Sequence, residues 1–137
     1  MNPTVPPVAP GPGRLLIVED DPDTSEVLQV LLQMEGYDVR TAASGDEGLA
    51  AAAQFDPHFV LLDMQLPVMQ GDKVARHLRV NEQGMHRVLI GTTGYGDRHD
   101  APVAFDHWLA KPIDTDRLCG LLRQEWATRF AGSPYAF

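Results

Sequence analysis

Five polar side chains in this sequence share one setting, because each stands at or near the end of a short apolar run. They are Glu19, Asp20, Asp63, Thr93 and Lys111. A carboxylate at the mouth of an apolar core is costly unless it has a function, because the ionised group loses hydration there. A carboxylate nucleophile, an ammonium group, a hydroxyl and a metal ion are together the parts needed to accept a phosphoryl group.

The apolar runs themselves predict the strands of a parallel sheet. Short, fully apolar runs are typical of strands that are buried on both faces. Together with one alternating segment, they predict five strands, at residues 15–18, 37–42, 59–62, 88–90 and 108–110. Helix signals separate these strands. The strand–helix alternation therefore predicts an α/β fold, with one parallel sheet, helices on both of its faces and right-handed crossovers.

The first helix has clear boundary signals. Asp21 followed by Pro22 is a typical N-cap with proline in the first turn, and Gly36 is a typical helix end. The pattern predicts an apolar face made of Val27, Leu28, Val30, Leu31, Leu32 and Met34. Because Pro22 follows it, we interpret Asp21 as a helix cap and not as a metal ligand.

The remaining helices are marked in a similar way. Ser44 with Glu47 predicts a capping box for a second helix at residues 50–54. A third helix follows Gly71, and Asp114 caps the last one, whose apolar stripe consists of Leu118, Leu121, Leu122 and Trp126.

The carboxyl ends of parallel strands meet at one edge of the sheet, so the five polar side chains should converge there. The three carboxylates repel one another, and each pair at about 4 Å costs roughly 4 kcal/mol at an effective dielectric near 20. A divalent cation and the lysine ammonium would remove this cost. Since the ligands are oxygens and no His or Cys is spaced to join them, the sequence selects a hard ion. Few ligands with room for water favour Mg²⁺ over Ca²⁺.

Composition excludes several classes of protein. The chain has 137 residues, a net charge of -8 and one cysteine, Cys119. An acidic chain does not favour nucleic-acid binding, a single cysteine allows no internal disulfide, and there is neither an export signal nor a membrane-spanning run. We expect a cytoplasmic protein with a Pro/Gly-rich disordered leader at residues 1–13, one domain at 14–130 and a short tail at 131–137.

Four motifs at these strand ends resemble one known family. They are VED at 18–20, D-x-x-L-P-x-M-x-G at 63–71, TGYG at 93–96 and KP at 111–112. The chain resembles a receiver domain of bacterial two-component response regulators, here of the stand-alone type, over about residues 14–130. The resemblance implies a flavodoxin-like fold, a strand order of 2-1-3-4-5 and a cis Lys-Pro peptide bond.

The resemblance also implies a role for each site residue. Asp63 would be the phospho-acceptor and, with Asp20 and the backbone carbonyl of Gln65, a direct Mg²⁺ ligand, while Glu19 would act through water. Lys111 would bind the phosphoryl group.

Further implied roles concern switching and signal lifetime. Thr93 would be the switch hydroxyl and Trp108 the switch aromatic. Gln65 and Tyr95 would guard the path of the water that hydrolyses the phosphoryl group.

The implied partners are a sensor histidine kinase or phosphotransfer protein as donor, and an unidentified protein as target, with no nucleic acid or membrane. Such a domain is a signalling phospho-acceptor and not an enzyme with a separate substrate. Relative to the family, the segment from Thr93 to Lys111 is short by about four residues, roughly one helical turn. We therefore expect a shortened or irregular fourth helix at residues 97–104, with Trp108 packed partly over the gap.

Three other functions remain open. A phosphatase of the haloacid dehalogenase type would need a second Asp two residues after Asp63, where this chain has Gln65. A flavin-binding module of the same fold would offer hydroxyls and amides after the first strand, where this chain offers three carboxylates. A receiver-fold docking module that signals without phosphorylation is the third.

Overall fold

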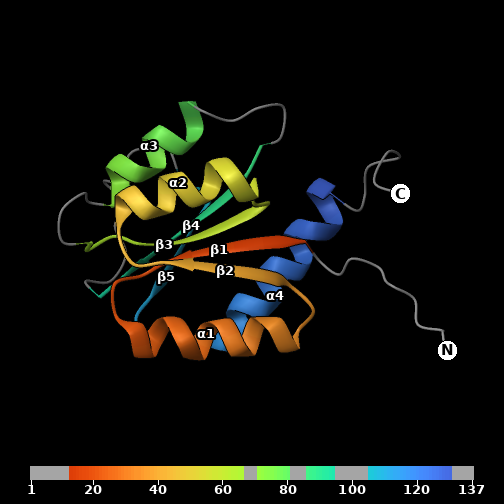
Figure 1. The fold of residues 1–137 in the computed structure, drawn as a ribbon. Helices are drawn as coiled ribbons and strands as arrows, with labels where there is room; N and C mark the ends of the chain where they lie inside the picture. The colour runs from red at the N-terminus through yellow and green to blue at the C-terminus, as the bar shows by residue number, and fades with distance from the viewer. Residues whose placement is uncertain (1–12, 67–70, 81–85, 95–104, 131–137) are drawn as a thin grey trace, which may run out of the picture.

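The structure, a computed structural model, describes residues 13–66, 71–80, 86–94 and 105–130 (Figure 1). The strands are β1 (Arg14–Val18), β2 (Asp38–Ala42), β3 (Phe59–Asp63), β4 (Val88–Thr93) and β5 (His107–Ala110). The helices are α1 (Pro22–Met34), α2 (Gly45–Phe55), α3 (Gly71–Val80) and α4 (Thr115–Glu125), followed by a π-helical turn, η1 (Trp126–Phe130). The predicted fourth helix at 97–104, the leader before Gly13 and the tail lie outside the described residues.

The five strands form one parallel sheet in the order β2-β1-β3-β4-β5, which confirms the predicted fold and strand order. In Figure 1, α2 and α3 cover one face of the sheet, and α1 and α4 cover the other. Alternate residues of each strand point to opposite faces, so the sheet has two apolar cores. Leu15 and Ile17 belong to the core under α1 and α4, whereas Leu16 and Val18 belong to the core under α2 and α3.

Helix α1 begins where the sequence predicts. Asp21 is its N-cap and accepts a hydrogen bond from the backbone N–H of Thr24, and Pro22 lies in the first turn. Gly36 follows the helix with φ 103°, a left-handed conformation that favours glycine.

The predicted apolar face of α1 was too broad. Leu28 and Leu32 are buried, but three other members of the predicted face point to solvent: Val27 is 64% exposed, Val30 51% and Met34 80%. The sheet contacts only a narrow stripe of the helix, and these three residues lie outside that stripe.

Helix α2 is longer than predicted. It starts at Gly45, because the side chain of Ser44 accepts a hydrogen bond from the backbone N–H of Glu47 (3.2 Å) and fixes the N-cap there. Glu47 in turn accepts a hydrogen bond from the backbone N–H of Ala43, one residue before the N-cap. The Ser44 half of the predicted capping box is therefore present, the Glu47 half is shifted by one residue, and the predicted start at residue 50 was wrong.

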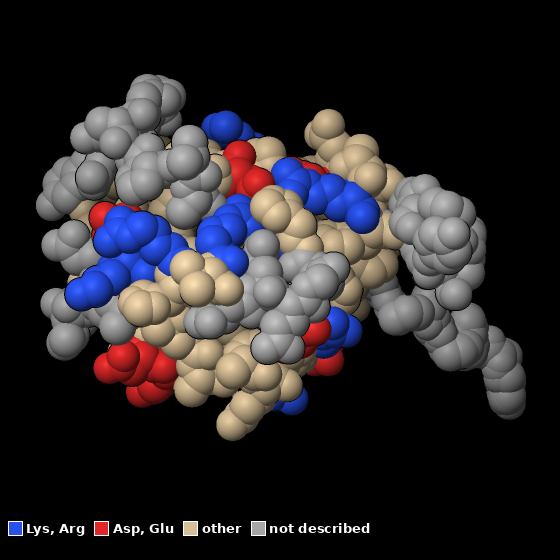
Figure 2. Space-filling view, turned by 90° about the horizontal axis from the view of Figure 1, so that it is seen from above, with Lys and Arg blue, Asp and Glu red and all other residues tan. Residues whose placement is uncertain are grey.

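Charge is unevenly distributed over the surface. Figure 2 views the molecule from above in Figure 1, where α2 and α3 lie, and Lys and Arg side chains lie across the middle of this view. Helix α3 carries two exposed basic residues, Lys73 and Arg76. The net charge of -8 therefore does not make this face acidic. Within the described ranges, no helix is long and apolar enough to span a membrane.

Candidate functional site

The polar residues at the strand ends lie together as the sequence predicts. The Lys111 ammonium nitrogen lies 3.2 Å from Asp63 Oδ1 and 3.3 Å from Glu19 Oε1. Asp63 is 3% exposed and Glu19 5%, so two carboxyl groups and one ammonium group meet at the buried end of the sheet. Asp20 is next to them and exposed.

The environment of Glu19 raises the pKa of its carboxyl group above the usual range. Burial is the main cause, and the negative charge of Asp63 adds to it, whereas the hydrogen bond from the backbone N–H of Asp21 (3.1 Å) and the charge of Lys111 oppose it. Burial alone would lower the pKa of Lys111, but the charges of Asp63 and Glu19 outweigh it and raise that pKa. Lys111 is therefore held in its charged form.

The residues that follow Asp63, Met64 and Gln65, are held close to the end of β3. The backbone N–H of Gln65 donates to Asp63 Oδ1 (2.9 Å), and that of Met64 donates to the carbonyl of Thr92 (3.0 Å). A Cβ on Gly71 would lie 2.7 Å from the Asp63 carbonyl oxygen and 2.8 Å from Met64 Cα. Only glycine fits at that position, which explains why α3 can start so near the end of β3.

The acidic groups fit a hard cation. Glu19, Asp20 and Asp63 each offer a carboxylate oxygen, and these oxygens lie within 4.8 Å of one another. Oxygen-only ligands that are partly open to water suit Mg²⁺. Burial is the larger cause of the raised pKa of Glu19, and the nearby negative charge of Asp63, which a cation would neutralise, adds to it.

The ends of β4 and β5 complete the site. Thr93 is 1% exposed, and its carbonyl accepts a hydrogen bond from the backbone N–H of Lys111 (2.8 Å). The neighbouring Thr92 is also buried, but successive strand residues point to opposite faces, so only one of the two threonines can face the site. The Lys111–Pro112 bond is cis, as the family resemblance implies. Tyr95 lies outside the described residues.

Trp108 is half-buried and packs on Phe105, with ring centroids 4.6 Å apart. Its indole ring lies over Gly91, which faces it across the β4–β5 ladder. The sequence predicts the position of Trp108 but gives no sign of this contact, because Gly91 and Trp108 are neighbours only across the sheet.

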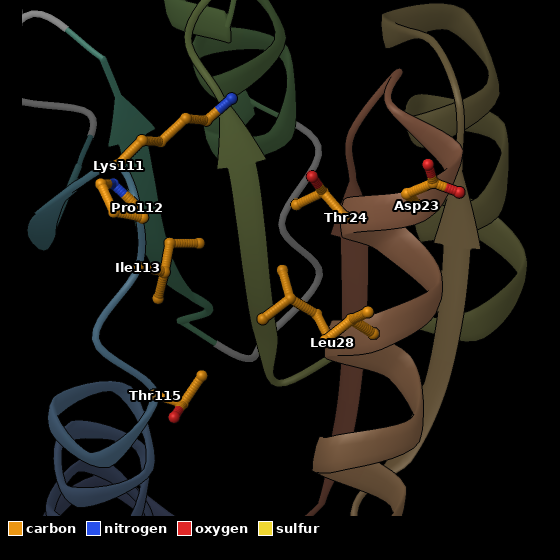
Figure 3. A pocket seen from close by; sticks show the side chains of 8 residues that line it. Asp23, Thr24, Leu28, Lys111, Pro112, Ile113 and Thr115 are labelled. Atoms are coloured by element: carbon orange, nitrogen blue, oxygen red, sulfur yellow. The ribbon is translucent and has the colours of Figure 1, made fainter.

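An apolar groove beside the site was not predicted. It lies between the first turns of α1 and the segment after β5, and has a volume of about 570 Å³ (Figure 3). Lys111 stands at one end of it, and the other lining residues are Asp23, Thr24, Val27, Leu28, Pro112, Ile113 and Thr115.

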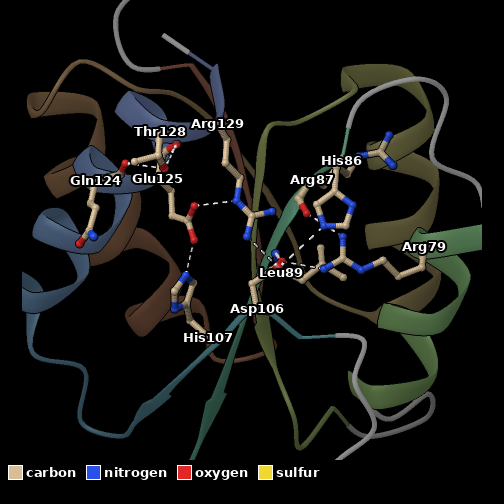
Figure 4. A network of polar contacts seen from close by, with 10 residues as sticks. All are labelled: Arg79, His86, Arg87, Leu89, Asp106, His107, Gln124, Glu125, Thr128 and Arg129. Carbon is tan, nitrogen blue, oxygen red and sulfur yellow. Dashed lines mark hydrogen bonds and ion pairs between the residues drawn. The ribbon is translucent and has the colours of Figure 1, made fainter. Parts of the chain in front are cut away.

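A second polar cluster holds the start of β5 (Figure 4). Asp106 Oδ2 accepts hydrogen bonds from the backbone N–H of Leu89 (2.8 Å) and from Arg79 (2.6 Å), and Arg129 reaches Oδ1 (3.2 Å). These donors lower the pKa of Asp106, although burial acts in the opposite direction. Glu125 contacts both Arg129 and His107, so the cluster joins α3, β4, β5 and the C-terminal turn.

Comparison with known proteins decides the family. The family model described as "Response regulator receiver domain" matches residues 15–123. The chain belongs to this family. It is therefore a receiver domain of two-component response regulators, a signalling module and not a conventional enzyme.

Curated relatives of this receiver domain include transcriptional regulators. It is 34% identical over 114 residues to the DNA-binding dual master transcriptional regulator RpaA of Synechocystis, covering 80% of this chain and 47% of that protein. The chain spans about half the length of such relatives. By contrast, an uncharacterised 14.6 kDa protein of Leptolyngbya boryana is 31% identical and is covered over 87% of its length.

Solved receiver domains have the same fold. A putative response regulator from Chloroflexus aurantiacus is 30% identical with a TM-score of 0.75, over 85% of this chain and 98% of that one. The receiver domain of a sensor histidine kinase from Pseudomonas aeruginosa, 27% identical with a TM-score of 0.75 over the same shares of both chains, carries a magnesium ion in its active-site cleft. Receiver domains bind Mg²⁺ at an acidic site, and this receiver domain has such an acidic cluster.

Proposed function

We propose that this receiver domain accepts a phosphoryl group on Asp63 and thereby changes its affinity for a protein partner. The observation that carries the proposal is the buried Asp63 carboxylate, with the Lys111 ammonium 3.2 Å away and a second buried carboxylate on the same ammonium. A nucleophile, a fixed positive charge and an acidic metal site at one strand end are the arrangement that phosphoryl transfer requires.

In the transfer step, an oxygen of the Asp63 carboxylate attacks the phosphorus atom of a phosphohistidine on the donor protein. The new O–P bond forms as the P–N bond breaks, and the donor imidazole keeps the electron pair and takes up a proton. Lys111 would neutralise one phosphoryl oxygen, and the Thr93 hydroxyl would donate a hydrogen bond to another.

The metal ligands in this proposal are Asp20, Asp63 and the backbone carbonyl of Gln65, with Glu19 acting through water. When bound, Mg²⁺ supplies charge neutralisation for the phosphoryl oxygens. The chain's own contribution is to crowd carboxylates at that point, so that a cation is favoured there before any donor arrives.

Loss of the phosphoryl group would be governed by the two positions that flank the water path. Gln65 is exposed, and its carboxamide can orient a water molecule. Tyr95, two residues after Thr93, is bulky and offers no carboxylate or carboxamide, so we expect slow to moderate self-hydrolysis.

The donor, a sensor histidine kinase or phosphotransfer protein, must bring its histidine to the edge of the sheet where Lys111 lies. The groove beside Lys111 supports contact there, since Val27 is 64% exposed and Leu28, Pro112 and Ile113 line the same hollow. Apolar surface left open next to a reactive group is suited to a protein partner.

The direct test is incubation with acetyl phosphate and MgCl₂, followed by peptide mass spectrometry. Label should appear on Asp63 in the parent protein and be absent from Asp63→Asn. Asp38→Asn serves as the matched control, because Asp38 is an exposed carboxylate at the amino end of β2. An unmodified parent protein would contradict the proposal and favour a docking module that signals without phosphorylation.

A further inference from the structure

We propose that Gly91 and Trp108 form a positioning pair: the indole packed on Gly91 fixes the end of β5 and therefore the place of Lys111. This inference rests on the proposed function, because it concerns the residue that would bind the phosphoryl group. Neither residue touches the acceptor carboxylate in this proposal, and both act through β5.

Strand β5 depends on few contacts. It has four residues and, among the described residues, pairs only with β4, through Ile90–His107, Gly91–Trp108, Thr92–Leu109 and Thr93–Ala110. Lys111 follows the last of these pairs directly, and its backbone N–H donates to the Thr93 carbonyl (2.8 Å). A displacement of the end of β5 therefore moves both Lys111 and its contact with Thr93.

The two ends of β5 are held differently. At the start, Asp106 binds the backbone of Leu89 through both its own backbone and its side chain, and Arg79 and Arg129 hold its carboxylate (Figure 4). At the other end, the ion pairs are those that Lys111 itself makes with Asp63 and Glu19, just after the last strand residue. There, Leu109 packs into the core on one face, and on the opposite face Trp108 packs on β4.

The contact at Gly91 leaves no room for a larger residue. A Cβ on Gly91 would lie 2.7 Å and 2.9 Å from two atoms of the Trp108 ring, and 3.1 Å from Phe105. Both are rigid rings that also pack on each other. Any side chain at position 91 would therefore clash with the indole. Either the Trp108 ring must rotate away or β5, which carries it, must shift.

Gly91 also lies on the same face of β4 as Thr93, because residues two apart in a strand point the same way. The Trp108 indole, which lies over Gly91, is therefore on the same face of the sheet as the Thr93 hydroxyl, which would bind the phosphoryl group. The metal ligands, in contrast, follow β1 and β3, and their contact with this end of β5 is the Lys111 ammonium, which repels a metal ion and does not bind it. This separation makes the proposal testable.

The test uses Gly91→Ala in a Trp126→Phe background, which leaves Trp108 as the single tryptophan of the two in the chain. We expect the rate of Asp63 phosphorylation by acetyl phosphate at saturating Mg²⁺ to fall about tenfold, because a misplacement well under 1 Å is costly in a positioned reaction. Mg²⁺ affinity, measured by calorimetry, should not fall, because the carboxylate ligands stay in place. Gly120→Ala is the matched control, since its Cβ would meet nothing within 4 Å.

A second background separates positioning from a general effect on the strand. In Trp108→Leu, the added methyl group of Gly91→Ala no longer meets the indole and keeps only the 3.1 Å contact with Phe105, so the rate should fall much less than it does with Trp108. Trp108→Leu alone should also slow phosphorylation without a loss of Mg²⁺ affinity, which keeps the idea testable if Gly91→Ala fails to fold.

Three outcomes would overturn the proposal. In the first, Gly91→Ala keeps the parent rate, whether or not a red-shifted emission shows that the indole has swung outward. In the second, Gly91→Ala slows the reaction by the same factor whether residue 108 is Trp or has been replaced by Leu. In the third, Trp108→Leu alone keeps the parent rate. If the parent protein takes no label on Asp63, the proposed function fails, which is a different and distinguishable result.

Discussion

Replacing Lys111 with methionine should destabilise the protein when magnesium is absent. The ammonium nitrogen lies 3.2 Å from Asp63 and 3.3 Å from Glu19, whose side chains are only 3% and 5% exposed. Methionine keeps an unbranched apolar side chain, so the substitution removes mainly the charge. Two buried carboxyl groups would then face each other without a cation.

The expected loss can be bounded from these contacts. At an effective dielectric near 20, each of the two attractions is roughly 5 kcal/mol before desolvation is counted. Removing one partner of a buried ion pair typically costs about 3–5 kcal/mol. Lys111 is 29% exposed, and protonation of Glu19 relieves part of the repulsion, so we expect a loss of about 2–3 kcal/mol. For a domain of this size, that lowers Tm by roughly 8 °C.

The assay is urea unfolding at neutral pH followed by circular dichroism, in EDTA and in MgCl₂. Magnesium should stabilise Lys111→Met more than it stabilises the parent protein, because the ion replaces the missing positive charge and no ammonium repels it. Lys111→Arg, which keeps the charge, is the control. Equal stability of Lys111→Met and the parent in EDTA would refute this reasoning, as would equal gains from magnesium.

Four further predictions follow from the site and its surroundings. Magnesium should raise Tm of the parent protein in proportion to the logarithm of its concentration, and Asp20→Ala should lose most of that gain; an equal gain would place the ion elsewhere. The pKa of Asp106 is lowered in the folded state, so its ionised carboxylate stabilises the folded protein. This contribution to the free energy of unfolding is fully present above the unfolded-state pKa of about 3.9 and is lost as pH falls through the folded-state pKa. Acid unfolding of Asp106→Asn should therefore depend less on pH than that of the parent, and parallel curves would count against this. Tyr95→Ala should shorten the lifetime of the phosphorylated form, and an unchanged half-life would remove Tyr95 from the argument. Sedimentation should show no phosphorylation-driven dimer through the face of β5 and α4, and a dimer lost on mutating α4 would contradict the prediction.

The sequence predicts that the site residues lie close together, because the apolar run marks a buried strand and the polar residue at its end marks the edge of the sheet. The run before Asp63 is apolar enough to be a buried strand, and the acid that ends it has no structural reason to be there. The Asp21 cap and the strand order follow from equally local rules.

Features that depend on contacts between distant segments could not be predicted. The apolar residues of α1 all fit a helical pattern, and periodicity cannot separate those that pack on the sheet from Val30 and Met34, which remain open to solvent. In the same way, Gly91 is merely a poor strand residue until Trp108, 17 positions later in the sequence, is known to lie over it.

The order of the strands in the sheet also has a consequence for how the chain folds during synthesis. Strand β4 is buried along its whole length, yet its second neighbour, β5, is made only after residue 106. Until then, a growing chain exposes one row of unpaired backbone groups on an apolar strand, which is a template for unwanted pairing with other chains. Truncated proteins that end before His107 should therefore aggregate, and the soluble state should appear abruptly once the last strand and α4 can reach the sheet.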